Sequence, residues 1–231
     1  MTPANDRGTP GREAEEVPRG GSPSICILDY GMGNLRSAEK AFEHVGATVR
    51  RITGAGEAEG FDGLVLPGVG AFPEAMRRIR ALGFDELATG WASAGRPLLG
   101  ICLGMQLLFE SSEENEGADG LGLLGGGVGA LEAPGLKVPH MGWEPVRWER
   151  PSRFAPELTA GGATSFYFVH SFAPRPTDDA VVVGTAEWGE RFPAVVESGS
   201  VLGAQFHPEK SSAAGLELLA GFARACTPIA A

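Results

Sequence analysis

The stretch LLGICLGMQLLFE, residues 98–110, decides the fold, because it joins an apolar strand pattern to an apolar helix pattern through a cysteine between two glycines. Residues 96–101 read as a strand and residues 105–110 as a helix. The segment between them is G-x-C-x-G, which is the nucleophile-elbow pattern with cysteine in place of serine. Gly100 and Gly104 permit a tight turn that carries Cys102 on its tip. A buried cysteine that packs as a small apolar residue is the alternative.

The predicted position of Cys102 suits nucleophilic chemistry. A cysteine at a helix N-terminus lies at the positive end of the helix dipole, which favours the thiolate. The backbone N–H of Leu103 can then point at an oxyanion. The flanking glycines favour this interpretation over a purely structural cysteine.

A cysteine nucleophile needs a base, and the chain has four histidines. His44 falls late in an amphipathic helix pattern, which is typical of a surface residue. His140 and His170 lie in or beside strand patterns, without an acidic residue two or three positions further on. His207 follows the strand pattern VLGAQF and precedes Pro208 and Glu209. Because sites form at the carboxyl ends of parallel strands, Cys102, His207 and Glu209 are predicted to form a triad.

Two glycine-rich turns follow other strand patterns. PGVGAF, residues 67–72, can turn a peptide N–H toward a neighbouring site, although an ordinary strand-to-helix turn is the alternative. DYGMGNLRS, residues 29–37, begins like a dinucleotide-binding fingerprint, but Arg36 stands where the third glycine is required. A turn into a helix is the better interpretation of the second segment.

The order of the elements predicts an α/β fold. Strand and helix patterns alternate over the first half, which indicates a mostly parallel sheet flanked by helices. Residues 110–124 are acidic and polar, and an exposed loop is expected there. Short strand patterns dominate afterwards, with a hairpin turn at residues 198–200, and a helix over residues 213–225 closes the chain. A single domain over residues 24–231, with added β-rich segments in its second half, is therefore predicted.

Composition excludes several classes of function. The chain has 231 residues, of which 43% are hydrophobic, and a formal net charge of -10 without a basic stripe, which argues against nucleic-acid binding. Three cysteines without a CxxC motif suggest neither a disulfide framework nor a zinc site, and free thiols suit a reducing cytoplasm. No apolar run approaches the roughly 20 residues of a membrane helix. Residues 1–23 are polar and rich in Gly, Pro and Glu, and are expected to be a disordered extension.

The motifs together resemble a class I (triad) glutamine amidotransferase and, more narrowly, the family of glutaminase subunits of imidazole glycerol phosphate synthase, from histidine biosynthesis. The resemblance is carried, in this order, by DYGMGNLRS, LPGVGAF, GICLGMQLL, PHMGWEPV, FYFVHSF and QFHPEKS. These motifs span about residues 25–212. The elbow and triad alone give only the class.

The resemblance implies a role for each matching residue. Cys102 would attack the side-chain amide of L-glutamine, His207 would move the protons and Glu209 would orient His207. Further roles concern the oxyanion, the substrate and a partner. The implied oxyanion donors are Val69 and Leu103, the substrate contacts are Gly70, Gln106, Ser171 and Phe172, and the partner-interface residues are His140, Trp143 and Lys210.

The implied reaction runs through a γ-glutamyl thioester and delivers ammonia to a separate cyclase subunit, a (β/α)₈ barrel in this family. The implied assembly is a heterodimer, and no metal or organic cofactor is expected. Two residues depart from the family pattern. Phe172 stands where the family commonly has Tyr, which removes a hydroxyl, and Glu144 stands where Asn is common, which could alter a partner contact.

Three other functions stay open from the sequence. The chain could serve a different ammonia-using synthase, although HMGW and HPEKS argue against it. It could be an unrelated cysteine hydrolase with the same elbow, or a catalytically silent regulatory module. The intact cysteine, histidine and glutamate argue against the silent module.

Overall fold

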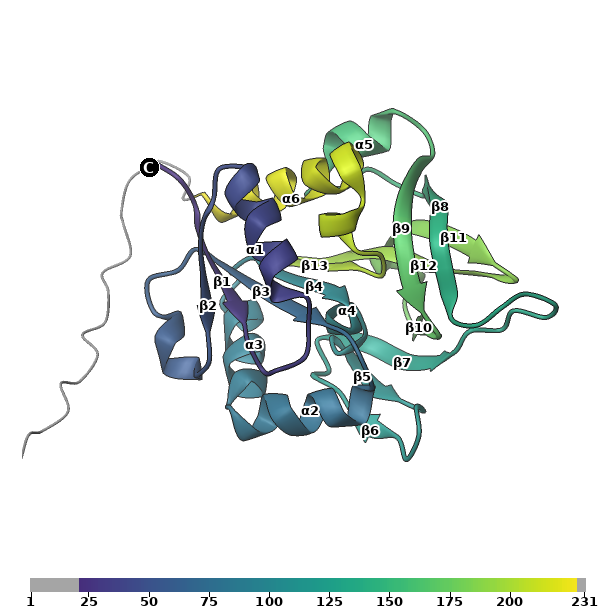
Figure 1. The fold of residues 1–231 in the computed structure, drawn as a ribbon, viewed down its shortest axis with the longest axis horizontal. Coiled ribbons are helices and arrows are strands. Elements are labelled where there is room, and N and C mark those ends of the chain that lie inside the picture. Colours follow the sequence, from purple (N-terminus) through teal and green to yellow (C-terminus); the bar gives the residue numbers. More distant parts are fainter. Residues whose placement is uncertain (1–20, 228–231) are drawn as a thin grey trace, which may run out of the picture.

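A mixed nine-stranded sheet forms the centre of the computed structural model, which describes residues 21–227 (Figure 1). The strand order is β2-β1-β3-β4-β13-β12-β11-β8-β9. Five of these strands run parallel: β1 (Ser24–Leu28), β2 (Thr48–Ile52), β3 (Gly63–Gly68), β4 (Leu98–Cys102) and β13 (Val201–Ala204). Strands β1, β3, β4 and β13 are buried along their whole length, which explains their continuous apolar sequences.

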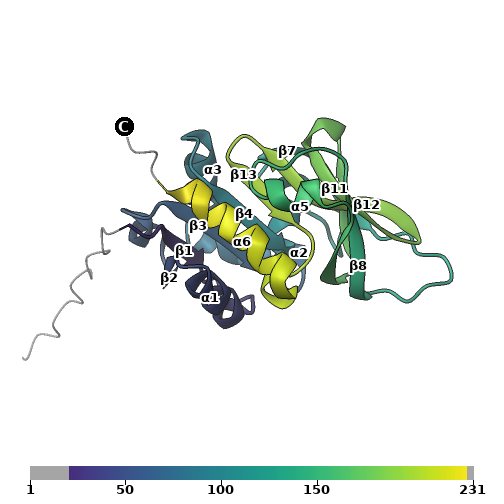
Figure 2. The same cartoon turned by 90° about the horizontal axis from the view of Figure 1, so that it is seen from above.

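Helices cover both faces of the parallel half (Figures 1 and 2). One face carries α1 (Leu35–His44) and α6 (Ser212–Cys226), and the other carries α2 (Phe72–Ala81) and α3 (Phe84–Ser93). Successive side chains of β1 point to opposite faces of the sheet, which explains the two layers. Ile25 and Ile27 pack in one layer with Phe42 and Phe222, and the residues between and after them pack in the other layer with α2 and α3. Pro73 lies in the first turn of α2, where the missing backbone N–H of proline would have no partner inside the helix.

The second half of the chain adds mostly antiparallel strands. Strands β12 (Glu190–Ser198), β11 (Val182–Trp188), β8 (His140–Trp148) and β9 (Thr164–His170) extend the central sheet. The hairpin predicted at residues 198–200 is confirmed, because β12 and β13 pair on either side of it. A second sheet contains β10 (Phe172–Pro176), β7 (Leu124–Ala130), β5 (Phe109–Ser112) and β6 (Ala118–Asp119).

Two expectations for residues 103–124 were wrong. The helix after the elbow, α4 (Leu103–Gln106), is one turn long, and the chain re-enters a strand at Phe109. Residues 107–109 are fully buried, so their apolar sequence reflects core packing rather than a longer helix. The segment expected to be an exposed loop contains β5 and β6, and Ser112 is buried.

Short helices complete the described chain: α5 (Pro156–Ala160) and 3₁₀ turns at Ala55–Ala58, Asp179–Val181 and Pro208–Lys210. The predicted α/β architecture, with a mostly parallel core and added β-rich segments, is confirmed. Most of the predicted N-terminal extension, residues 1–20, lies outside the described residues, and the carbonyl of Pro23 already accepts a hydrogen bond from the Thr48 backbone N–H. Within residues 21–227, no helix combines the length and apolar character needed to cross a membrane.

Candidate active site

Three neighbouring strands end at the same edge of the sheet. In the register of β3, β4 and β13, Gly68 lies opposite Cys102 and Ala204 lies opposite Ile101. The residues that follow are therefore brought together: the glycine-rich turn after β3, the cysteine at the end of β4, and His207 shortly after β13. This is the carboxyl edge of the parallel strands, where sites form in α/β sheets.

Cys102 occupies a strained turn that its glycine neighbours make possible. Its φ of 54° and ψ of -110° are unusual for a residue with a Cβ. A Cβ at Gly104 would lie 1.8 Å from the Leu66 carbonyl oxygen, and one at Gly100 would lie 2.6 Å from the Gly104 carbonyl oxygen. Both positions therefore require glycine, and α4 packs directly on β3 and β4. The backbone thus has the tight geometry that the elbow pattern predicted.

His207 and Glu209 form a buried pair beside the cysteine. His207 Nδ1 lies 2.8 Å from Glu209 Oε1, and each side chain is 4% exposed. The His207 backbone N–H donates to the Tyr167 carbonyl, and the Ser211 hydroxyl donates to the His207 carbonyl at 2.7 Å. These bonds fix the turn after β13 against β9, so the imidazole is held in one orientation.

The charges around His207 favour its protonated form. Burial acts to lower its pKa, but hydrogen bonds to Cys102 and Glu209, together with their negative charges, outweigh burial and raise the pKa of His207 to about 9. The Cys102 Sγ also lies 3.6 Å from the Val169 carbonyl oxygen, to which the thiol can donate. The arrangement can hold an imidazolium next to a thiolate, which is the activated state of a cysteine nucleophile.

A cavity of about 300 Å³ opens over Cys102. It contains nine of the residues predicted for the site: Val69, Gly70, Cys102, Leu103, Gln106, Ser171, Phe172, His207 and Lys210. Glu209, which pairs with the Nδ1 atom of His207, is not among the lining residues. Four residues that were not predicted for this cavity also line it: Glu114, Pro139, Val169 and His170.

The loop of residues 67–72 is fixed at both ends and exposed in its middle. The Tyr30 hydroxyl donates to the Pro67 carbonyl at 2.6 Å, and the Phe72 backbone N–H donates to Glu114 Oε2 at 2.7 Å. Val69 is 41% exposed, and Gly70 has a φ of +102° that favours glycine. The DYGMGNLRS segment thus supports this loop through Tyr30, which accounts for the motif without a dinucleotide.

Comparison with known proteins agrees with this geometry. The family model Glutamine amidotransferase class-I matches residues 26–226. The imidazole glycerol phosphate synthase subunit HisH of Moorella thermoacetica is 48% identical over 198 residues, which cover 86% of this chain and 93% of that protein. This chain belongs to the HisH family of class I glutamine amidotransferases. The HisH protein of Rhodopirellula baltica is 44% identical over 207 residues, which cover 89% of this chain and 100% of that protein.

Solved structures agree on the fold of this HisH family member. A crystal structure of a glutamine amidotransferase matches with a TM-score of 0.69 at 22% identity, covering 87% of this chain and 98% of that one. The structure of PurLQS from Thermotoga maritima also matches with a TM-score of 0.69, at 23% identity, covering 89% of this chain and 98% of that one. At these identities the likeness concerns the fold.

Besides His170, two polar residues at this site were missed by sequence reasoning. Glu114 lies in the segment that was expected to be an exposed acidic loop, but it lines the cavity and holds the Phe72 backbone N–H. Gln205 is fully buried, and its Nε2 lies 3.8 Å from Cys102 Sγ. A signal for Gln205 was present, since a glutamine inside the apolar run VLGAQF is unusual for a buried strand end.

The three residues predicted for a partner interface differ in exposure. His140 is fully buried between Phe168 and Trp188, so its side chain cannot belong to an exposed docking surface, and this expectation is corrected. Trp143 is 50% exposed, and Lys210 is exposed at the rim of the cavity. His44 is exposed near the end of α1, as its sequence position predicted.

Proposed function

We propose that the chain hydrolyses L-glutamine to L-glutamate and ammonia through a thioester on Cys102. The observation that carries this proposal is the placement of Cys102 in the lining of the cavity, hydrogen-bonded to His207, which forms a buried pair with Glu209. A strained elbow, a base and an orienting carboxylate are the three parts of a nucleophile triad, whatever their order in the chain.

The proposed first half-reaction begins with the thiolate of Cys102. It attacks the carboxamide carbon of glutamine and pushes the carbonyl electrons onto oxygen, where the backbone N–H groups of Leu103 and Val69 would stabilise the oxyanion. His207, protonated at this stage, gives its proton to the amide nitrogen. The C–N bond then breaks, ammonia leaves and a γ-glutamyl thioester remains on Cys102.

The second half-reaction regenerates the thiol. His207, now neutral, takes a proton from water, and the hydroxide attacks the thioester carbonyl. The resulting tetrahedral intermediate expels the Cys102 sulfur, which recovers the proton from His207. Glutamate leaves with the new C–O bond. Glu209 keeps the imidazole in one tautomer and stabilises its charged form throughout.

The cavity offers complementary groups for the amino-acid end of glutamine. Glu114 is its only lining carboxylate among the described residues, and a carboxylate suits the substrate's α-ammonium group. Gly70, Gln106, Ser171 and Phe172, the substrate contacts expected from the sequence, also line this cavity. Both amide donors of Gln106 are used within the protein, so its Oε1 is the atom available to a ligand. Phe172 can contribute only its ring and backbone.

The proposed acceptor of the ammonia is a separate cyclase subunit in a heterodimer. The curated relatives are subunits of imidazole glycerol phosphate synthase, so the glutaminase reaction would serve that synthase in histidine biosynthesis. Four exposed apolar residues, in β8 and in the segment just before it, offer a docking surface: Leu136, Val138, Met141 and Trp143. The free thiols of the described chain suit a reducing cytoplasm.

The test is a comparison of glutamine hydrolysis by the chain alone, by its complex with the cyclase subunit, and by the complex with the cyclase substrate bound. Low activity alone and strong activation in the complex are expected, because the middle of the 67–72 loop can rest with a peptide turned away from the oxyanion. Loss of one oxyanion donor lowers the rate by about 10²–10³. Full activity of the isolated chain would contradict the coupling, and no glutamine hydrolysis in any state would contradict the function.

A further inference from the structure

Gln205 places an amide against the sulfur of Cys102. It follows β13, is fully buried, and its backbone N–H is already satisfied by the Ala194 carbonyl at 2.9 Å. The side chain is therefore not needed to complete the sheet. Its Nε2 lies 3.8 Å from Cys102 Sγ, within the range of an N–H···S hydrogen bond.

Gln106 fixes which end of the Gln205 amide faces the sulfur. The Gln106 Nε2 donates both of its protons, to the Phe172 carbonyl at 2.9 Å and to Gln205 Oε1 at 3.1 Å. Because a donor must meet an acceptor, the Gln205 oxygen points at Gln106 and its NH₂ group points at Cys102. A flipped amide would place two NH₂ groups against each other in a buried site, where unmade hydrogen bonds are costly.

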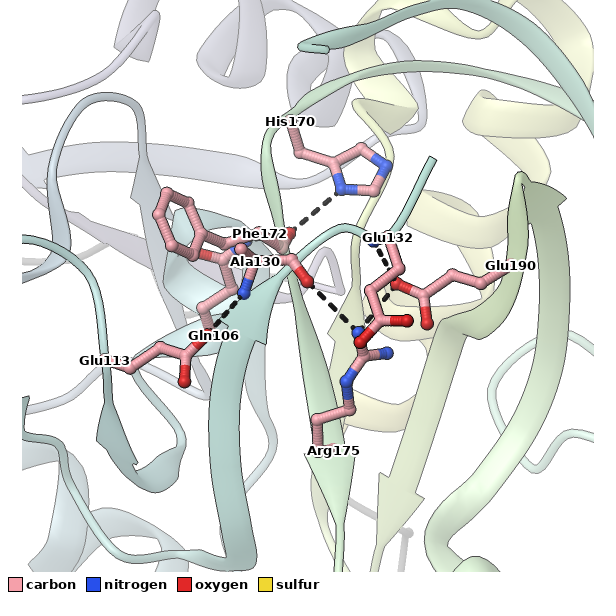
Figure 3. Close-up of polar contacts among 8 residues, drawn as sticks. All are labelled: Gln106, Glu113, Ala130, Glu132, His170, Phe172, Arg175 and Glu190. Atoms are coloured by element: carbon pink, nitrogen blue, oxygen red, sulfur yellow. Dashed lines mark hydrogen bonds and ion pairs between the residues drawn. The ribbon is translucent and has the colours of Figure 1, made fainter. Parts of the chain in front are cut away.

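A pair of buried histidines holds the other end of this network. In Figure 3 the ring of His170 points at the Phe172 carbonyl, and the Nδ1···O distance is 2.9 Å. The carbonyl only accepts, so His170 carries its proton on Nδ1 and its Nε2 must accept. The donor to Nε2 is His140 Nδ1, at 3.0 Å. Burial lowers the pKa of both histidines to about 4, which keeps this single arrangement of protons near neutral pH.

The strand that carries the Phe172 carbonyl is itself anchored (Figure 3). Phe172 is the first residue of β10, which pairs with β7. Further along β10, the Arg175 guanidinium bonds the Ala130 carbonyl at 3.2 Å and Glu190 Oε1 at 2.6 Å. The second sheet thus holds the Phe172 carbonyl, which accepts hydrogen bonds from both Gln106 and His170. The whole network therefore has one hydrogen-bonded arrangement.

We propose that Gln205 is a catalytic residue of the glutaminase reaction, because its amide N–H donates to the Cys102 sulfur and stabilises the attacking thiolate, while His170 and His140 are positioning residues that fix this amide through the Phe172 carbonyl and Gln106. The inference rests on the proposed function in that Cys102 is the nucleophile. The same N–H also stabilises the sulfur when it leaves the thioester. Gln205 does not line the cavity, so it acts on the sulfur and not on substrate binding.

The direct test measures the alkylation rate of Cys102 by iodoacetamide at pH 7 in the full chain, followed by peptide mass spectrometry. Gln205→Met keeps the length of the side chain and removes both the donor to Cys102 and the acceptor for Gln106. We expect a rate about tenfold below the wild type, as for the loss of one hydrogen bond to a charged group. Cys26 and Cys226 are buried and serve as internal controls, since they react only if the core opens. An unchanged Cys102 rate in folded Gln205→Met would overturn the proposal.

Steady-state kinetics in the complex with the cyclase subunit separates this role from a structural one. Gln205→Met is expected to lower kcat about tenfold, and Gln205→Glu, which keeps the acceptor for Gln106, is expected to leave KM within about threefold, whereas a distorted cavity would raise KM. If Gln205→Met fails to fold, Gln205→Glu keeps the acceptor for Gln106 without the donor, and its Cys102 alkylation must fall at least as far. A Gln205→Glu chain that reacts at the wild-type rate contradicts the proposal.

Two variants of His170 test the positioning role. The amide nitrogen of Asn occupies nearly the same place as the Nδ1 of His, so His170→Asn keeps the donor to the Phe172 carbonyl, whereas His170→Phe removes it. We expect His170→Phe to slow Cys102 alkylation several-fold and His170→Asn to restore most of the rate. Equal rates in the two variants would remove the histidines from the proposal. A Cys102→Ala complex that still hydrolyses glutamine would instead refute the proposed function, independently of these alkylation results.

Discussion

Gly68 and Cys102 are register partners in the parallel strands β3 and β4. The two strands therefore end side by side at the same edge of the sheet. The chain continues from β3 into the glycine-rich loop and from β4 into the elbow. This pairing brings Val69 to the same cavity as the cysteine, although 33 positions separate the two residues in sequence. The sheet register itself thus sets the relation between the nucleophile and the predicted oxyanion loop, and it explains why both glycine motifs follow buried strands.

Substitutions of the triad partners are expected to differ in severity. His207→Ala removes the group that is proposed to move protons and should lower kcat in the complex by about 10³-fold or more, while Cys102 can still be alkylated. Glu209→Ala removes the orienting carboxylate only, so its loss of kcat should be smaller. Steady-state kinetics of both variants with the cyclase subunit measures the ranking. A Glu209 variant slower than the His207 variant would reverse these roles.

The two buried histidine environments predict a stability maximum near neutral pH. His140 and His170 have pKa values of about 4 in the folded chain, below the ordinary value of 6.5. Between pH 4 and pH 6.5 the unfolded chain therefore binds more protons than the folded chain. The free energy of unfolding should fall as the pH drops from 6.5 to 4. His207 has a raised pKa of about 9, so its contribution is present below pH 6.5 and is lost as the pH rises through 9.

Urea unfolding of wild type and His140→Phe across pH 4 to 6.5 measures the acid side of this prediction. The phenyl ring can keep the stacking on Phe168 and Trp188, and the pH dependence of the unfolding free energy should become shallower because one titrating group is lost. His44→Gln is the matched control, since His44 is exposed on the folded chain. An equal change of slope in both variants would contradict the assignment of this pH dependence to the buried pair.

Gly104, the second glycine of the elbow, is expected to tolerate no side chain. Gly104→Ala places a Cβ 1.8 Å from the Leu66 carbonyl oxygen, which should cost about 3 kcal/mol or more of unfolding free energy, at the upper end of overpacking effects. Gly90→Ala in α3 is the control, because a Cβ at that position would have no atom within 4 Å, and a helix gains up to about 1 kcal/mol from this change. Denaturant unfolding that found the two variants equally stable would contradict the close packing of α4 on β3.

The exposed Trp143 in β8 is expected to contribute to partner binding and not to folding stability. Trp143→Ala removes a large ring that is 50% exposed and should weaken binding of the cyclase subunit by about 2 kcal/mol, with the thermal midpoint of the isolated chain nearly unchanged. Titration calorimetry measures this effect. Lys40→Ala on the exposed side of α1 serves as the control. Equal affinities for the two variants would place the docking surface elsewhere.

The sequence predicted the fold well where one rule dominated. Buried parallel strands appear as continuous apolar runs, so β1, β3, β4 and β13 were recognised, and the glycines around Cys102 predicted the elbow. The errors lie where local signals conflict with packing. Residues 107–109 are apolar because they fill the core, and apolar residues alone do not distinguish a helix from a buried strand entry.

The roles that the sequence did not predict depend on contacts between distant segments. Glu114 stands in an acidic stretch that looks solvated, and only the folded chain places it against the Phe72 backbone N–H. His140 and His170 lack nearby acids in the sequence, yet antiparallel pairing of β8 and β9 sets them opposite each other. Cross-strand register of this kind is not encoded in short motifs, which is why the hydrogen-bonded network behind Cys102 appears only in the structure.

Glutamine hydrolysis is proposed to proceed through a thioester on Cys102. The most direct measurement is acid quenching of the complex with the cyclase subunit during turnover, followed by mass spectrometry of the peptide that contains Cys102. The expected result is a γ-glutamyl adduct on Cys102 that is absent from Cys102→Ala, together with loss of glutamine hydrolysis in that variant. Continued hydrolysis by a folded Cys102→Ala complex, or an adduct on another residue, would contradict it.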